Sequence, residues 1–478
     1  MSAKPFEPSW NSIRTHPTPR WFQEAKFGIY THWGVYAVPA RGPNATWYPY
    51  NMYREGTPQY DYHLKMYGGP AKFGYKDFIP QFTGEKFDPA AWADLFRRAG
   101  ARFAGPVGEH HDGFCMWDTR LSEWNAKKMG PRRDVVGELE KAIRNQGLKF
   151  LVALHHAENW WFYPHWRKEF DTSDLRWSGL YGEPHNLDGN VGEGFFEQDP
   201  PSQAFLERWK AKTLEVIERY QPDLLWFDFG IRGIQEHYRL EMLAEYYNLA
   251  NSWGKEVVVT YKWHDLAPGA GVVDLELGRF DSLTYHDWIT DTTVDLGEAW
   301  GYIQEAEYKS VRTLVHYLVD NVSKNGYLLL NVGPKANGEI PDEAQELLLG
   351  MGKWLEINGE AIYGTTPWLT FGEGPTHMKK SGYFMEDQEV QYTAKDIRFT
   401  VKDDRLYAIL LGWATEPVLI QSLKQLYPGE IKAVHMSGVD GELDWRWTPD
   451  GLLVTLPAEK PCDHAFVLRI DRQHPFQG

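Results

Sequence analysis

The chain has 478 residues, a formal net charge of -16 from 66 Asp+Glu against 50 Lys+Arg, and two cysteines. An acidic chain repels polyphosphate, which argues against nucleic acid as a partner, and no Lys- or Arg-rich run favours an anionic membrane surface. This length suits one large catalytic domain followed by a smaller one.

The cysteines and the N-terminal sequence bear on the compartment. Cys115 and Cys462 lie far apart in the sequence, so we predict two free thiols in a reducing environment. Residues 1–22 lack a basic segment followed by an apolar one, and no run of ~18 apolar residues predicts a membrane span. We expect a cytoplasmic protein, or a secreted or periplasmic one if a signal peptide has been removed. A homo-oligomer is compatible with the sequence.

In chain order, short apolar runs alternate with segments of helical period. The predicted strands are 26–34, 101–113, 148–160, 222–230, 256–263 and 326–333. The predicted helices are 89–100, 134–147, 203–220, 237–253, 308–326 and 341–359. Such alternation favours a parallel sheet, and the first strand continues into THWGVYAVP rather than a glycine-rich phosphate turn. We therefore predict a (β/α)₈-like TIM barrel over 1–365, in preference to an open doubly wound sheet.

From about residue 366 the pattern changes to alternating polar and apolar residues. The segments 390–412, 429–438, 443–458 and 463–470 are separated by the turn signals KDDR, GVDGE and TPDG. This pattern predicts a C-terminal antiparallel β-sandwich over 366–478, and the fold class is α/β.

Aromatic residues are abundant, with 22 Trp, 26 Tyr and 24 Phe, and many fall in the loop-like stretches 44–53 and 158–170. Exposed aromatic rings are unfavourable unless they bind a ligand, and the apolar faces of sugars stack on such rings. The same aromatic content would also be expected of a large hydrophobic core, so composition alone does not distinguish carbohydrate binding from packing.

Asp228 ends the apolar run LLWFDFG, where an ionised carboxylate needs a partner or a function. Glycoside hydrolysis uses two carboxyl groups, so a second one must come from another strand end or loop. Glu276, flanked by Leu275 and Leu277, could be held protonated by an apolar environment. The alternatives, which spacing does not separate, are Glu109, Glu158, Asp274 and Glu298.

The histidine pairs 110–111 and 155–156 raise the alternative of a metal site. No H-x-H on a strand, C-x₂-C or H-E-x-x-H pattern is present, so we predict no metal and no cofactor, with HHDG binding hydroxyl groups instead. On a regular strand only one of His110 and His111 would face the mouth of the barrel.

Four long segments, WFQEAKFGIYTHWG, GEHHDG, PDLLWFDFG and LVDNVSKNGYLLLNVGPKANGEIP, resemble the family 29 glycoside hydrolases, the retaining α-L-fucosidases. The resemblance covers about residues 8–370 and continues more weakly through the tail. It implies an exo-acting enzyme that removes terminal α-L-fucose from a fucosylated oligosaccharide or glycoconjugate. It implies Asp228 as nucleophile and favours Glu276, in DLELGR, as acid/base. The substrate-binding residues it implies are His32, Trp47, His110, His111, Trp226 and Trp300.

Two departures keep alternatives open. Thr46 stands where many relatives carry a hydroxyl-binding glutamate, and Lys262 stands where some carry an arginine. Lysine cannot form the two-pronged contact of a guanidinium. The alternatives are therefore a glycosidase acting on another L-hexose, or a catalytically weak fucose-binding barrel.

Overall fold

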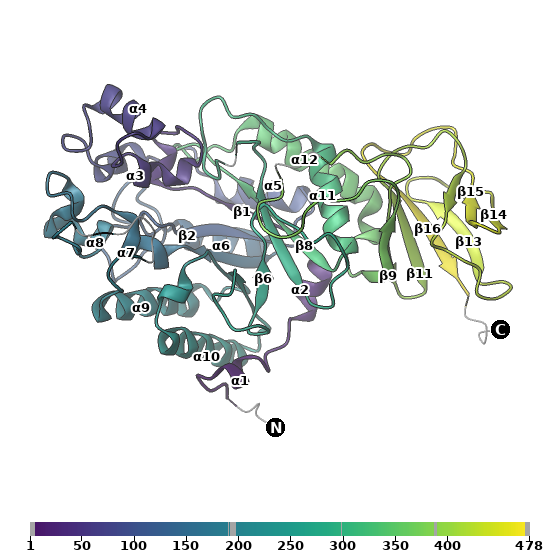
Figure 1. The fold of residues 1–478 in the computed structure, drawn as a ribbon, viewed down its shortest axis with the longest axis horizontal. Helices are drawn as coiled ribbons and strands as arrows, with labels where there is room; N and C mark the ends of the chain where they lie inside the picture. Colours follow the sequence, from purple (N-terminus) through teal and green to yellow (C-terminus); the bar gives the residue numbers. More distant parts are fainter. Residues whose placement is uncertain (1–4, 190, 192–196, 298, 387–389, 474–478) are drawn as a thin grey trace.

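A closed barrel of eight parallel strands forms the larger part of this computed structural model, which describes residues 5–189, 191, 197–297, 299–386 and 390–473 (Figure 1). The strands follow one another around the barrel in sequence order. They are β1 Phe27–Thr31, β2 Phe103–Glu109, β3 Lys149–Leu154, β4 Leu224–Phe227, β5 Val258–Lys262, β6 Val272–Asp274, β7 Trp288–Thr293 and β8 Gly326–Val332.

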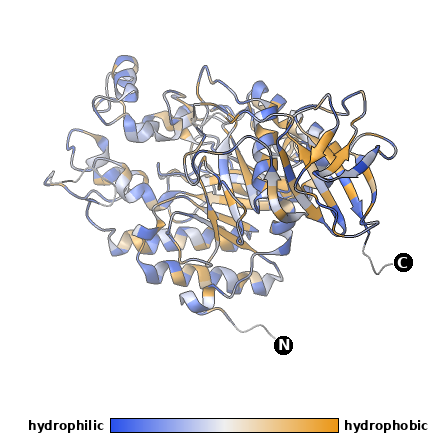
Figure 2. Ribbon diagram, turned by 45° about the vertical axis from the view of Figure 1, so that its right-hand side comes forward, coloured by the Kyte–Doolittle hydropathy of each residue, from blue (hydrophilic) through white to orange (hydrophobic). Residues whose placement is uncertain are grey.

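The apolar character of these strands follows from burial on both faces. Every residue of β1, β2, β4, β5, β7 and β8 is buried, which is typical of parallel strands covered by helices. Figure 2 shows the barrel strands mainly in the hydrophobic colour and the outer helices in mixed colours. The six predicted strands are confirmed, whereas β6 and β7 were not predicted.

Helices surround the barrel and begin at residues suited to their first turn. Side chains of Asp88, Asp134, Ser202 and Ser310 accept hydrogen bonds from backbone N–H groups of α5, α6, α9 and α11. The six predicted helices are confirmed as α5 Pro89–Arg98, α6 Val135–Asn145, α9 Gln203–Tyr220, α10 Glu236–Trp253, α11 Val311–Ser323 and α12 Asp342–Asn358. The shorter ones are α1 Trp10–Ile13, α2 Arg20–Ala25, α3 Tyr48–Asn51, α4 Pro58–Tyr67, α7 Asn159–Phe162 and α8 Ser178–Tyr181.

The barrel is irregular on one side. The connections β5–β6 and β6–β7, both fully described, contain no helix. These two loops therefore stay at the rim of the barrel, where they can contribute side chains to a site.

Side chains fill the interior of the barrel. One buried cluster includes Phe22 from α2 together with Phe103, Leu224 and Trp226 from the strands. Because side chains fill the interior, no channel runs through the barrel, and a ligand site must lie at one of its ends.

The C-terminal part packs two antiparallel sheets. The order is β13–β16–β11–β10–β9 in one sheet and β12–β15–β14 in the other, and both contribute to one apolar core. The strands are β9 Thr366–Glu373, β10 Ile397–Lys402, β11 Arg405–Leu410, β12 Val418–Ile420, β13 Ile431–Met436, β14 Trp445–Thr448, β15 Gly451–Val454 and β16 Phe466–Arg472. The predicted fold class, a barrel followed by a β-sandwich, is confirmed. β9 and β12 were not predicted, because Pro/Gly-rich and short segments carry a weak strand signal.

Two smaller predictions can also be compared with the structure. Cys115 and Cys462 are both free thiols, as expected. Among the described residues, no helix combines the length and the apolar character that crossing a bilayer requires.

Candidate active site

Ionisable side chains from four neighbouring strands meet at the carboxyl end of the barrel. Asp228 directly follows β4, Lys262 ends β5, Asp274 ends β6, and Asp291 lies in β7. The parallel register pairs Lys262 with Asp274 and Asp274 with Ile289, so these residues lie at one level. In a barrel of this type the catalytic groups stand at this rim.

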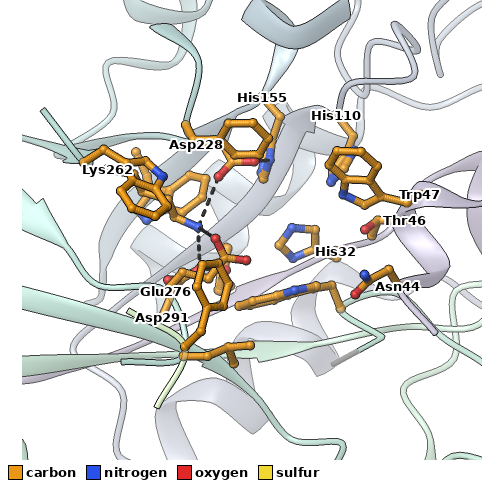
Figure 3. Close-up of a pocket in the computed structure, with 17 residues that line it drawn as sticks. His32, Asn44, Thr46, Trp47, His110, His155, Asp228, Lys262, Glu276 and Asp291 are labelled. Carbon is orange, nitrogen blue, oxygen red and sulfur yellow. Dashed lines mark hydrogen bonds and ion pairs between the residues drawn. The ribbon is translucent and has the colours of Figure 1, made fainter. Parts of the chain in front are cut away.

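The ammonium group of Lys262 lies at the centre of the cluster (Figure 3). Its Nζ is 2.7 Å from Oε2 of Glu276, 3.1 Å from Oδ1 of Asp228 and 3.4 Å from Oδ2 of Asp291. The lysine is buried, and these carboxylates hold its pKa well above the usual value despite the opposing effect of burial. A permanent positive charge therefore stands between the two carboxyl groups that the sequence singled out.

Asp228 is held in its ionised form from two sides. Oδ2 lies 3.0 Å from Nδ1 of His155 and 3.3 Å from Nε2 of His111, while Oδ1 faces Lys262. Burial by itself would raise the pKa of this carboxyl, but Lys262 and the two histidines bring it well below its usual value. Asp228 is thus an anion fixed in orientation at neutral pH.

Glu276 reaches the cluster from the β6–β7 loop. Backbone hydrogen bonds from Leu275 to Ile289 (2.8 Å) and from Leu277 to Asp291 (2.9 Å) tie this loop to β7. Burial raises the pKa of Glu276 to about 7, and Lys262 opposes the shift while Asp291 adds to it. A carboxyl group with this pKa can both donate and accept a proton near neutrality.

A second row of polar groups lies beneath the first. The indole N–H of Trp226 donates to Oδ2 of Asp274, and the hydroxyl of Tyr30 donates to Oδ2 of Asp291 at 2.9 Å. Burial and the neighbouring Asp291 raise the pKa of Asp274 well above its usual value. Asp274 is therefore a neutral hydrogen-bonding group that fixes the indole of Trp226.

Three histidines, His32, His110 and His155, form one wall of the site. Nδ1 of His32 is 2.8 Å from the side-chain oxygen of Asn331, and the rings of His110 and His155 stack at 4.4 Å. Burial lowers the pKa of His155 to about 4 and those of His32 and His110 well below 6.5, so these three rings are neutral. Within the described chain, Nδ1 of His110 and Nε2 of His155 are buried without a hydrogen-bond partner.

Both histidines of the 110–111 pair approach the site, because β2 ends at Glu109 and strand alternation no longer applies. Their ring centroids are 4.3 Å apart, His110 lines the cavity and His111 contacts Asp228 from behind. Of the pair, His110 lines the cavity, whereas His111, which the resemblance implied as a substrate-binding residue, does not.

These groups surround a cavity of about 280 Å³, close to the lower limit of ~300 Å³ for small-molecule sites. Its residues from the predicted set are Asp228, Glu276, His32, Trp47, His110, Trp226 and Trp300. Thr46, His155 and Lys262, which the sequence analysis also discussed, line it as well. Sequence reasoning did not single out its remaining residues, Tyr30, Asn44, Phe229, Trp263, Leu277, Asp291 and Phe384. Asp291 was missed because β7 was missed.

The alternatives for the second carboxyl group are separated by the structure. Glu109 is buried in an ion pair with Lys212 at 2.6 Å, outside the cavity. Glu158 is fully buried and does not line the cavity, and Asp274 bonds to Trp226 below it. Glu298 lies outside the described residues. Of the described candidates, Glu276 is the one that lines the cavity with Asp228.

The two departures noted in the sequence both fall in the cavity wall. Thr46 is buried in the short helical turn Ala45–Trp47, and Asn44 precedes it with φ 50°. Figure 3 shows Asn44 and Thr46 side by side, across the cavity from Lys262. An amide side chain is thus available next to the position that lacks a glutamate.

Several bulky residues of the cavity wall have left-handed backbone conformations. Trp263, Leu277, Trp300 and Phe384 have φ of 54°, 47°, 56° and 54°. Each such conformation costs about 1–3 kcal/mol for a residue other than glycine and is found mainly where function requires it. The wall of the cavity therefore carries backbone strain.

Two groups of side chains have donor atoms close enough together to hold a metal ion. They are His32, His110 and His155, and His111, His155 and Asp228. In both groups, however, His155 shares its Nδ1 with Asp228, and the charge of that carboxylate is already balanced by Lys262.

Comparisons with known proteins identify the family of the chain. The sequence model described as α-L-fucosidase matches residues 1–360, and that of the α-L-fucosidase C-terminal domain matches residues 388–471. Rat tissue α-L-fucosidase is 34% identical, with 98% of this chain and 93% of the relative covered. Human plasma α-L-fucosidase is 33% identical, with 98% and 93% covered.

Solved structures lead to the same family. The α-fucosidase of Thermotoga maritima in complex with fucose superposes with a TM-score of 0.77 at 32% identity, covering 97% of this chain and 100% of the other. The same enzyme with a mechanism-based inhibitor gives a TM-score of 0.78, covering 97% and 99%. A barrel with two facing carboxyl groups, a β-sandwich behind it, and matches over nearly the whole chain establish that this protein belongs to the α-L-fucosidase family.

Proposed function

We propose that this protein is an exo-acting, retaining α-L-fucosidase in which Asp228 is the nucleophile and Glu276 the acid/base. The observation that carries the proposal is the position of Lys262 Nζ, 3.1 Å from an oxygen of Asp228 and 2.7 Å from an oxygen of Glu276. These two oxygens cannot be farther apart than the two distances combined. That separation favours a retaining pair, at ~5–5.5 Å, over an inverting pair at ~6.5–9.5 Å.

In the first half of the reaction, a carboxylate oxygen of Asp228 forms a bond to the anomeric carbon of a terminal α-L-fucosyl unit. The glycosidic bond breaks as Glu276 transfers its proton to the departing oxygen. The products are a covalent fucosyl-enzyme and the released alcohol. The low pKa of Asp228 and the raised pKa of Glu276 support these opposite roles.

In the second half, the Glu276 carboxylate takes a proton from water, and the water oxygen displaces Asp228 from the anomeric carbon. One negative charge thus moves from Asp228 to Glu276 and back during the cycle. Lys262 contacts both positions, so its ammonium group stays close to the charge at either stage. Such fixed compensation of a moving charge lowers the barrier without reorganisation of solvent.

Recognition of the sugar falls to the remaining wall of the cavity. We propose that His32, His110, His155 and Asn44 bind the hydroxyl groups of fucose, with His111 orienting Asp228 from behind. The unpartnered ring nitrogens of His110 and His155 support this role. Trp47, Trp226 and Trp300 offer apolar surface for the ring and its methyl group.

The first test is a release assay with 4-nitrophenyl α-L-fucoside. Replacing Asp228 by Gly should lower kcat by ~10³-fold or more, because the covalent intermediate can no longer form. Glu346→Gln, on the exposed face of α12 and away from the cavity, is the matched control and should retain full activity. A near wild-type Asp228→Gly enzyme would refute the assignment.

The same assay separates the alternatives. A fucose-binding barrel without catalysis would release no nitrophenol, and an enzyme for another L-hexose would prefer an α-L-galactoside. A metal-dependent hydrolase would lose activity after dialysis against a chelator. We expect full activity after this treatment, because Lys262 already supplies the positive charge beside Asp228.

A further inference from the structure

A short segment of the β9–β10 connection lies along the loop that carries Glu276. Arg279 and Gly382 exchange backbone hydrogen bonds of 3.0 and 2.9 Å. The N–H of Phe384 donates to the carbonyl of Glu276 at 2.9 Å, and that of Met385 donates to Leu277 at 2.7 Å. The residues 382–385, which belong to the C-terminal part of the chain, thus pair with the catalytic loop through one antiparallel bridge and two further backbone hydrogen bonds.

This pairing brings three aromatic rings together at the mouth of the cavity. Trp263 and Tyr383 stack at 4.3 Å with an angle of 10°, and Phe384 lies 6.4 Å from Trp263. Trp263 and Phe384 line the cavity with 44% and 47% of their surface exposed, whereas Trp226 and Trp300 at its base are buried. Two large rings held open to solvent at the mouth of a site indicate a surface that binds a ligand.

These rings stand on the side where the leaving group must depart. Trp263 directly follows Lys262, whose ammonium contacts Glu276, and Phe384 bonds to the backbone of Glu276 itself. The acid that protonates the departing oxygen is therefore linked to both rings and lines the same cavity.

Contacts to the barrel fix the segment in place. The backbone N–H of Trp263 donates to the hydroxyl of Tyr383 at 2.6 Å, and Glu386 forms an ion pair with Lys309 at 2.8 Å. Both Trp263 and Phe384 have a φ of 54°, a conformation that these neighbouring contacts must maintain. These contacts hold the two rings in position.

We propose that Trp263 and Phe384 form the subsite for the leaving group, which takes the sugar ring next to the terminal fucose, and that the C-terminal part of the chain completes the active site by supplying Phe384. This proposal rests on the proposed function. The chemistry it requires is an apolar ring face, such as that of a hexose, stacked against an aromatic ring at the cavity mouth.

The test compares two substrates that share fucose and differ in the leaving group. An α-L-fucosyl-hexose disaccharide has a ring to stack, whereas α-L-fucosyl fluoride has a single atom. Phe384→Ala and Trp263→Ala should each lower kcat/KM for the disaccharide about tenfold or more, the loss expected for one ring contact. For the fluoride the change should stay within about threefold, and inhibition by free fucose should be unchanged.

The matched control is Tyr285→Ala, which removes a fully exposed ring from the same β6–β7 connection but not from the cavity. This variant should leave kcat/KM unchanged for both substrates. Tyr383→Phe keeps the stacked ring and removes the hydroxyl that accepts from Trp263, so it should produce a weaker loss restricted to the disaccharide.

Two results would overturn the proposal: equal losses for both substrates in Phe384→Ala and Trp263→Ala, or no loss for either. Equal losses would mean that the rings act through Glu276 rather than on the leaving group. Failure of the wild-type protein to hydrolyse either substrate would instead overturn the proposed function, and no variant is needed to observe it.

Discussion

The role of Lys262 depends on the carboxyl groups that surround its ammonium group. The sequence indicated the loss of a two-pronged arginine contact, but the structure places the ammonium within 3.4 Å of oxygens from three different carboxyl groups. A compact charge on a flexible stem suits this arrangement, because it can approach several acceptors at once.

We predict that Lys262→Met lowers kcat by roughly 10²-fold or more, the effect of removing one electrostatic contact to the reacting groups. Without the ammonium, the pKa of Asp228 should rise, since Lys262 is the strongest of the groups that lower it. The acidic limb of the pH–kcat/KM profile should therefore move upward. Lys262→Arg keeps the charge and should recover part of the activity. A Met variant with an unchanged acidic limb would contradict this role.

Glu276 sets the opposite limb of the same profile. The group must be protonated to act as an acid, and burial raises its pKa to about 7. Activity should accordingly fall as the pH rises through about 7, one decade per pH unit in kcat/KM. In Glu276→Gln this limb should vanish along with most activity on substrates whose leaving groups need protonation. A basic limb that persists in the variant would exclude Glu276 as its source.

At the scale of elements, the turn after β4 holds the proposed nucleophile in place. Gly230 has φ 95°, and its backbone N–H donates to Asp265 at 2.7 Å. A Cβ atom at this position would lie 1.2 Å from Oε1 of the buried Glu158. No other residue fits here without displacing either the turn or the carboxyl group behind it.

Gly230→Ala should therefore destabilise the protein by two effects, the left-handed backbone at about 1–2 kcal/mol and the overlap with Glu158 at a further ~1–3 kcal/mol. Gly254→Ala is the matched control: φ is 67° at the end of α10, and no atom beyond the adjacent residues lies within 4 Å of the added carbon. It should show the first effect alone. Denaturant unfolding measures the difference, and equal values for the two variants would argue against the overlap.

At the scale of the whole molecule, one buried carboxylate forms ion pairs with the catalytic loop, the barrel and the sandwich. Asp320 of α11 contacts Arg398 of β10 at 2.7 Å, Lys324 at 2.7 Å and Arg279 of the Glu276 loop at 3.6 Å. Burial opposes ionisation, but these cations lower the pKa of Asp320 well below its usual value.

Replacing Asp320 by Asn should cost about 3–5 kcal/mol of stability at neutral pH, because three buried cations lose their counter-charge. The carboxylate contributes fully above its unfolded pKa of ~3.9, and the contribution is lost as the pH falls below that value, so the difference from wild type should shrink in acid. Glu24→Gln removes an exposed pair with Arg20 and should cost at most about 0.5 kcal/mol. A similarly small loss of stability in Asp320→Asn would contradict the proposal that Asp320 holds the loop, the barrel and the sandwich together.

The sequence by itself determined the elements whose cause is local. Continuous apolar runs such as 148–160 and 326–333 can be buried on both faces of a sheet. Asp88 accepts hydrogen bonds from the first turn of the helix that Pro89 begins. The position of Asp228 at the end of an apolar strand was likewise evident, and the resemblance to a family selected Glu276 among five carboxyl groups.

Only the tertiary structure decided which side chains share the cavity. β6 has three residues, and its hydrogen-bond partners lie in other segments, so local pattern could not reveal it or the site residue Asp291 in β7. Phe384 lies 108 positions after Glu276 in the sequence, yet it bonds to the backbone of that residue. The reason is physical: hydrophobic period and capping act over a few residues, whereas the charge balance around Lys262 and the pairing of 382–385 exist only once distant parts of the chain have packed together.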